Sequence, residues 1–222
     1  MQVVVLSESA VDETVVRILV RALLPRDAEF VEPTIRHRGV DFLLRGGFRS
    51  LALATFYQGS ADGLACVVDA DMTPPHEERN ARWSPQSGGL ADLQACSDRC
   101  RLCYLRRQWA ASGLARRPRP KGSPPLRVAL GLAVPSIEAW LLAGSQFHVT
   151  EAAWRNYAAS QKQSYNNLAK QRVFSDLRGI DKKAERAEQR IEAILESAGW
   201  QQLQRLFPDG FGAFVRDLQR WR

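Results

Sequence analysis

The pattern of apolar and polar residues divides the first two thirds of the chain into buried strands and amphipathic helices. Residues 64–68 are all apolar and are bounded by glycine and proline, which is typical of a parallel strand covered on both faces. Residues 2–6 and 126–134 show the same apolar pattern. Residues 30–36 predict a weaker strand, because Pro33 interrupts it.

Helical periodicity separates these strands. Apolar residues recur at helical spacing between Val11 and Leu23, after the Ser-x-x-Asp capping pattern of Ser9 and Asp12. Residues 48–56 and 90–112 predict further helices, and Ser136 is placed to cap a short helix after the last strand. Alternating strands and helices predict an α/β fold with a mostly parallel, four-stranded, Rossmann-like sheet flanked by helices.

The chain divides into residues 1–145, the expected α/β core, and residues 146–222, an all-helical C-terminal region. The core carries an insertion at 73–125, which begins as a Pro- and Gly-rich loop. Its end, 116–125, is basic and predicts either a solvated linker or a loop that grips a phosphate backbone. The apolar stripes of the C-terminal helices predict either core or a partner interface.

Acidic residues follow three of the expected strands. Asp69 and Asp71 end the apolar run 64–68, Glu8 follows the first strand and Glu138 follows the last. The carboxyl edge of a parallel sheet is where open α/β folds bind ligands, so these acids are candidates for one site, with Mg²⁺ or Mn²⁺ as the cation that hard oxygen ligands prefer. Alternatively, Glu8 and Glu138 are acids stabilised by helix dipoles.

Charge adds a second indication. The net charge is +7; residues 1–115 carry 13 basic and 14 acidic side chains, and residues 116–222 carry 18 and 10. A basic half favours a phosphate-rich partner such as DNA or RNA, although 26 of the 31 basic residues are Arg, as in an arginine-rich proteome. The candidate backbone contacts are Arg45, Arg49, Arg116, Arg117 and Lys170.

No apolar run approaches the roughly 18 residues that cross a bilayer, and the N-terminus has no basic segment of a signal peptide. We therefore expect a cytoplasmic protein without a membrane partner. Trp140 and Trp154 are candidates for base stacking, but a tryptophan in an apolar helix more often packs in the core.

Four cysteines lie at positions 66, 96, 100 and 103. Cys66 lies in a buried strand and is expected to pack as a small apolar residue. Cys96, Cys100 and Cys103 share one face of the expected helix 90–112. Three thiols could bind zinc, but no fourth cysteine or neighbouring histidine completes a known pattern, so the sequence favours core packing.

The order of strand, Glu8, helix, strand, helix, strand and Asp69-x-Asp71 resembles the Toprim fold of topoisomerases, primases and overcoming-lysogenization-defect nucleases. The family pattern Glu-Gly-x-x-Asp stands here as Glu8-Ser9-Ala10-Val11-Asp12, with Ser in place of Gly. A third Asp of some members is Thr73 here. The segment Ile137-Glu138-Ala139-Trp140-Leu141-Leu142 looks like a Toprim-related branch that often sits beside ATPase genes in bacterial defence loci.

The resemblance implies a metal-dependent nuclease of anti-phage defence. Glu8, Asp69 and Asp71 would converge on one or two cations, and Asp12 or Glu138 would complete the shell. Glu8 could instead act as general base. The implied partners are nucleic acid, an AAA- or ABC-type ATPase subunit and further copies of the chain.

Two further hypotheses remain open. The chain could be a non-catalytic subunit that binds a nucleotide or an ATPase partner, with the C-terminal apolar stripe as interface. A phosphate-accepting receiver domain also gathers acids at strand ends, but it has no use for a basic helical region.

Overall fold

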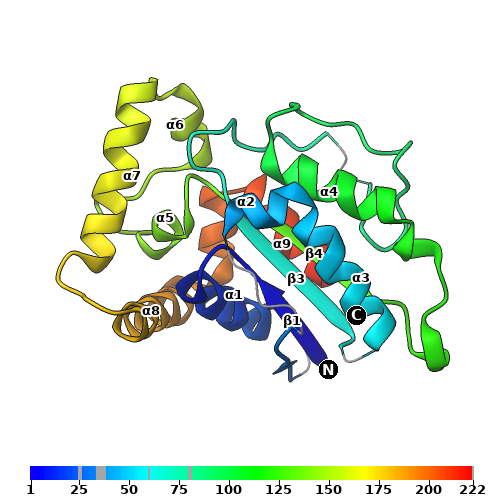
Figure 1. Cartoon of the computed structure of the whole chain (residues 1–222). Coiled ribbons are helices and arrows are strands. Elements are labelled where there is room, and N and C mark those ends of the chain that lie inside the picture. Colours follow the sequence, from blue (N-terminus) through cyan, green and yellow to red (C-terminus); the bar gives the residue numbers. More distant parts are fainter. Residues whose placement is uncertain (25–26, 34–38, 60, 80–81, 222) are drawn as a thin grey trace.

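Four parallel strands form one sheet at the centre of the protein (Figure 1). The computed structural model describes residues 1–24, 27–33, 39–59, 61–79 and 82–221. The strands are β1 (Gln2–Leu6), β2 (Glu29–Phe30), β3 (Gly63–Asp69) and β4 (Arg127–Ala133), in the order β2-β1-β3-β4. The predicted α/β fold with a four-stranded parallel sheet is therefore confirmed.

Helices cover both faces of this sheet. They are α1 (Ala10–Leu23), α2 (Val40–Phe42), α3 (Phe48–Gln58), α4 (Arg101–Ser112), α5 (Ile137–Leu141), α6 (Glu151–Asn156), α7 (Ala159–Phe174), α8 (Ile180–Leu206) and α9 (Gly210–Gln219), with the short turns η1 (Leu43–Gly47), η2 (Leu114–Arg116) and η3 (Pro120–Gly122). Helices α1, α8 and α9 contact one another on one face, and α3 and α4 pack together on the other. Figure 1 shows α5, α6 and α7 beyond the carboxyl ends of the strands.

The apolar run of β3 is buried along its whole length, as its uninterrupted apolar pattern predicted. Cys66 lies in this strand, and burial raises the pKa of its thiol far above the ordinary value. Helix α1 begins as predicted, with the Ser9 hydroxyl accepting the backbone N–H of Asp12 at 3.2 Å.

The C-terminal helices return to the sheet. A Cβ at Gly131 of β4 would lie 2.9 Å from Cβ of Phe214, so α9 approaches the strand at van der Waals distance. A Cβ at Gly63, at the start of β3, would lie 2.6 Å from Cζ3 of Trp221. The predicted stripe from Phe211 to Trp221 is buried, as is Ile191 of α8, so these residues form core and not an exposed partner surface.

Three details differ from the sequence prediction. The helix expected over 90–112 begins only at Arg101, and the residues before it form turns, so the three cysteines do not share one helical face. The strand expected over 30–36 is limited to Glu29–Phe30 among the described residues, and 34–38 lie outside them. Pro33 cannot donate a backbone hydrogen bond, which agrees with the early end of this edge strand.

The third difference concerns residues 116–125, expected as a solvated linker or as a loop that grips a phosphate backbone. Arg119 is buried, and its guanidinium donates to the carbonyl oxygens of Thr55, Phe56 and Pro124 at 3.1–3.5 Å. This segment is therefore packed against α3. None of the helices in the described ranges is long and apolar enough to span a bilayer.

Candidate functional site

Acidic side chains from three strand ends meet between β1 and β3. The chain leaves β1 toward β2 and leaves β3 toward β4, so the connections diverge here, and ligands of open α/β sheets bind at such a switch point. Glu8 lies two residues beyond β1, Asp69 ends β3, and Glu138 lies in the first turn of α5 after β4. Asp12 joins them from the first turn of α1.

Backbone hydrogen bonds fix two of these carboxylates. Glu8 Oε1 accepts the N–H of Asp69 at 2.9 Å, and Asp69 Oδ1 accepts the N–H of Ile137 at 3.0 Å. The second bond caps α5, a role that the sequence assigned to Ser136; the Ser136 hydroxyl is buried and forms no hydrogen bond. The ends of β1, β3 and β4 are thus connected through the acids themselves.

Glu138 differs from its neighbours because one of its oxygens has no partner. The side chain is 9% exposed, and its buried Oε2 accepts no hydrogen bond. A buried carboxylate oxygen without a partner carries a desolvation cost that a bound cation would relieve. We therefore identify Glu138 as a fitting ligand for a hard cation at this edge of the sheet.

Burial raises the proton affinity of three of these acids, Glu8, Asp12 and Asp69. It raises the pKa of Glu8 to about 7, although a hydrogen bond from the Asp69 backbone opposes the shift. Burial also raises the pKa of Asp12 to about 7, against hydrogen bonds from Ser9. The pKa of Asp69 lies well above its usual value through burial and through repulsion by Asp12, Glu8 and Glu138. A cation would displace these protons on binding.

Asp71 is held beside the cluster by Arg101. The backbone of Asp71 is left-handed, with φ of 47°, so its carboxylate does not simply follow the strand alternation from Asp69. Arg101 Nη1 donates to Asp71 Oδ2 at 2.8 Å and to the backbone oxygen of Asp69 at 2.6 Å, and it lies 3.5 Å from Glu8 Oε1. The positive charge of Arg101 therefore lies between Glu8 and Asp71, two of the predicted metal ligands.

A cavity of about 790 Å³ opens beside the acids. Its charged lining residues are Glu8, Asp12, Asp69, Glu138, Lys170 and Lys183. Lys170 of α7 is exposed; some desolvation at the cavity wall works against its charge, but Glu138 and Asp69 outweigh this and raise the pKa of Lys170. The C-terminal region therefore places two lysine side chains, Lys170 and Lys183, beside the acidic site. Asp71 does not line this cavity.

The charges of the site do not balance within the protein. Five carboxylates, those of Glu8, Asp12, Asp69, Asp71 and Glu138, face three basic groups, those of Arg101, Lys170 and Lys183. Fully ionised, this set carries two surplus negative charges, which one divalent cation would neutralise. The acids surround the cavity and do not close on one point, as in magnesium sites that complete their shell with water and phosphate oxygens.

The predicted backbone-binding arginines separate into two groups. Arg45 lies beside Arg101 and Thr73 around a second cavity of about 450 Å³, and exposed Arg49 follows in the first turn of α3. Arg116 and Arg117 follow the far end of α4, at the opposite edge of the sheet. Arg117 there donates to the Tyr57 hydroxyl at 3.4 Å. Of these residues, Lys170 lines the acidic cavity, and Arg45 lies beside Arg101, which contacts Asp71.

The tryptophans do not form a stacking surface. Trp140 and Trp154 are fully buried, and Trp140 packs edge-on against Phe211 of α9. Both belong to the core, in agreement with the simpler interpretation of their apolar helices.

Arg101 and Lys183 are the charged groups that sequence reasoning missed. Arg101 lies 30 residues beyond Asp71 in the long insertion, and no local pattern links the two. Comparisons of the chain with protein-family models, with curated proteins and with solved structures found no match.

Proposed function

We propose that the chain is a divalent-metal-dependent nuclease that hydrolyses phosphodiester bonds of nucleic acid. The observation that supports this most directly is the unpartnered, buried Oε2 of Glu138 among carboxylates that, when fully ionised, outnumber the basic groups of the site. Glu8, Asp69 and Glu138 would hold Mg²⁺ or Mn²⁺, with Asp12 behind them. When bound, such a cation polarises a phosphodiester and lowers the pKa of water.

The remaining residues of the site have roles that follow from their charge. Lys170 and Lys183 line the acidic cavity and would attract a phosphate group toward carboxylates that otherwise repel it. Arg101 would orient Asp71 through their hydrogen bond and leave Glu8 for the cation. Glu8, with a pKa of about 7, could also accept a proton near neutral pH.

The resemblance to the Toprim fold supports the same reaction class and extends the proposal to anti-phage defence beside a partner ATPase. The non-catalytic alternative used the C-terminal apolar stripe as its interface. That stripe is buried core, so it does not provide the interface suggested for that alternative.

The test is cleavage of plasmid, single-stranded DNA and total RNA with Mg²⁺ or Mn²⁺. Asp69→Asn keeps the oxygen that caps α5 but removes the charge, and we expect it to lower cleavage by at least about 100-fold. Glu192→Gln removes an exposed acid on α8 and should cleave like the wild type. EDTA should stop cleavage, and excess Mg²⁺ should restore it.

Equal cleavage by the wild type and by Asp69→Asn would indicate a contaminating nuclease and contradict the proposed site. Absence of cleavage, also after addition of a partner ATPase, would favour the non-catalytic subunit.

A further inference from the structure

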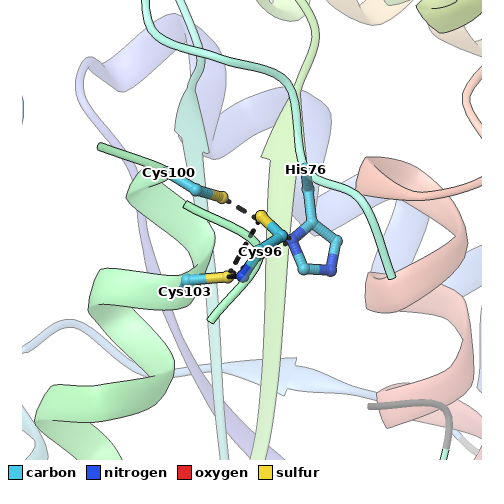
Figure 2. A group of neighbouring side chains, drawn as sticks. All are labelled: His76, Cys96, Cys100 and Cys103. Carbon is cyan, nitrogen blue, oxygen red and sulfur yellow. Dashed lines mark hydrogen bonds between the residues drawn. The ribbon is translucent and has the colours of Figure 1, made fainter. Parts of the chain in front are cut away.

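A second polar cluster lies on the α4 side of the sheet, where one histidine faces three cysteines (Figure 2). Nδ1 of His76 lies 3.6 Å from Sγ of Cys96, 3.6 Å from Sγ of Cys100 and 3.5 Å from Sγ of Cys103. All four potential ligand atoms lie within 4.8 Å of one another. His76, Cys100 and Cys103 are fully buried.

The sequence prediction of core packing for these cysteines missed His76. The histidine lies in the Pro-rich loop after β3, 20 residues before Cys96, and no sequence motif links the two positions. Among the described residues, this is the one group of His, Cys, Asp or Glu gathered closely enough to enclose an ion.

The spacing of the four atoms matches a tetrahedral zinc site. Zinc bonds of about 2.3 Å to sulfur and 2.0–2.1 Å to nitrogen place tetrahedral ligands about 3.8 Å apart for two sulfurs and about 3.6 Å apart for sulfur and nitrogen. The observed distance between the sulfurs of Cys96 and Cys103 is 3.5 Å. The intervals Cys96-x₃-Cys100 and Cys100-x₂-Cys103 also lie in the range of structural zinc sites.

A disulfide, an iron–sulfur cluster and simple core packing each fit these atoms less well. A disulfide would bring two sulfurs to about 2.05 Å, and all four cysteines of the chain are free thiols. Iron–sulfur clusters are held by four cysteines in most proteins. Core packing alone does not account for an imidazole nitrogen and three thiols that point at one another in the protein interior.

One outer contact of His76 is typical of a metal-binding histidine. Its second ring nitrogen, Nε2, lies 3.4 Å from Glu78 Oε2. Glu78 is itself fixed by two hydrogen bonds from Arg106, at 3.0 and 3.2 Å, and by Arg216 of α9 at 2.7 Å. A carboxylate on the second nitrogen sets the tautomer and orientation of histidines that bind zinc.

We propose that His76, Cys96, Cys100 and Cys103 bind one structural zinc ion. Four protein ligands leave no open position, so the ion does not act on a substrate. The three thiols bind as thiolates and release their protons to solvent. This inference is independent of the proposed nuclease function.

The position of the proposed ion indicates which segments of the fold it would connect. Cys100 and Cys103 flank Arg101 at the start of α4, and His76 follows Asp71 by five residues. Zinc would therefore join the loop after β3 to the beginning of α4. That junction places the Arg101 guanidinium against Asp71, at the edge of the acidic site.

The test is the zinc content of the chain, purified without a polyhistidine tag and measured by mass spectrometry of the elements. We expect about one zinc ion per wild-type chain, and the same content in Cys66→Ala, whose thiol lies in β3 outside the cluster, and in Glu138→Gln. Cys103→Ala should lose the ion. His76→Cys should retain it, because four cysteines also form a zinc site.

A second measurement covers variants that do not fold. Wild-type protein reconstituted with Co²⁺ should show the visible absorption of tetrahedral, thiolate-bound cobalt. A folded wild-type chain that contains no zinc and takes up neither zinc nor cobalt under reducing conditions would overturn the proposal. So would full zinc content in a folded Cys103→Ala variant.

Discussion

At the scale of single residues, Glu138 combines a cost to stability with a proposed function. Its unpartnered oxygen lies among like charges, so Glu138→Gln should stabilise the protein without added Mg²⁺ or Mn²⁺. We expect a gain of about 1 kcal/mol, or roughly 2–4 °C in Tm for a chain of this size. The variant should also lose the rise in Tm that Mg²⁺ gives the wild type.

Thermal unfolding with and without Mg²⁺ measures both effects, and Glu192→Gln is the control for removing a negative charge at an exposed position. A Glu138→Gln protein that is less stable than the wild type and still responds to Mg²⁺ would exclude Glu138 as a ligand.

The pKa values of Glu8 and Asp12 predict a stability that falls with pH. Both carboxyls have a pKa of about 7 in the folded protein, against ordinary values of 4.5 and 3.8. Between these limits the folded state binds more protons than the unfolded state, so the free energy of unfolding decreases as pH rises from about 4.5 to about 7. Buried Glu151 and Asp217, with pKa values of about 7, act in the same direction.

Urea denaturation at pH 5 and pH 8, without added Mg²⁺ or Mn²⁺, measures this slope. Glu8→Gln should show a smaller decrease than the wild type, because it no longer titrates at this position. An identical decrease in both proteins would show that Glu8 does not hold its proton in the fold.

At the scale of elements, α9 depends on two glycines with different surroundings. A Cβ at Gly210 would lie 2.2 Å from the backbone oxygen of Leu132, which cannot move away without distorting β4. A Cβ at Gly212 would meet Nη1 of the Arg216 side chain at 3.3 Å, a contact that a shift of a few tenths of an ångström relieves. We therefore expect Gly210→Ala to cost at least about 1–3 kcal/mol.

Gly212→Ala should instead be neutral or stabilise by up to about 1 kcal/mol, because alanine favours the helix. Chemical denaturation of the two variants is the measurement. Equal effects would mean that α9 does not pack closely on β4, and that the C-terminal region folds apart from the sheet.

The same scale separates what the sequence could predict from what it could not. The strands β1, β3 and β4 and the helix α1 follow from uninterrupted apolar runs and a capping residue, which are local signals. The placement of His76 and Arg101 depends on contacts between residues 20 to 30 positions apart, and no periodicity encodes such contacts. The sequence predicts that α4 begins at residue 90, whereas it begins at Arg101. The cysteines at positions 96, 100 and 103 have the spacing of one helix face although only Cys103 lies in the helix.

At the scale of the whole molecule, the basic C-terminal half completes an acidic site built by the first half. Lys170 and Lys183 reach the acids because α7 and α8 pack beside α5 and α1. The excess positive charge of residues 116–222 is thus partly placed where a phosphate backbone would approach the carboxylates.

This placement predicts which cations determine binding to nucleic acid. Binding of single-stranded DNA to the Asp69→Asn variant should weaken steeply with salt, because the contacts are with phosphates. Lys170→Gln and Arg45→Gln, which remove cations near the acids, should each weaken binding and reduce the slope of the logarithm of affinity against the logarithm of salt concentration by roughly 1.

Arg116→Gln and Arg117→Gln are the matched controls, because they remove the same charge at the opposite edge of the sheet. They should leave both the affinity and the salt slope nearly unchanged, since a strand bound at the acidic cavity does not pass them. If these controls weaken binding as much as Lys170→Gln does, the nucleic acid follows a different surface, and the acidic cavity is not where it binds.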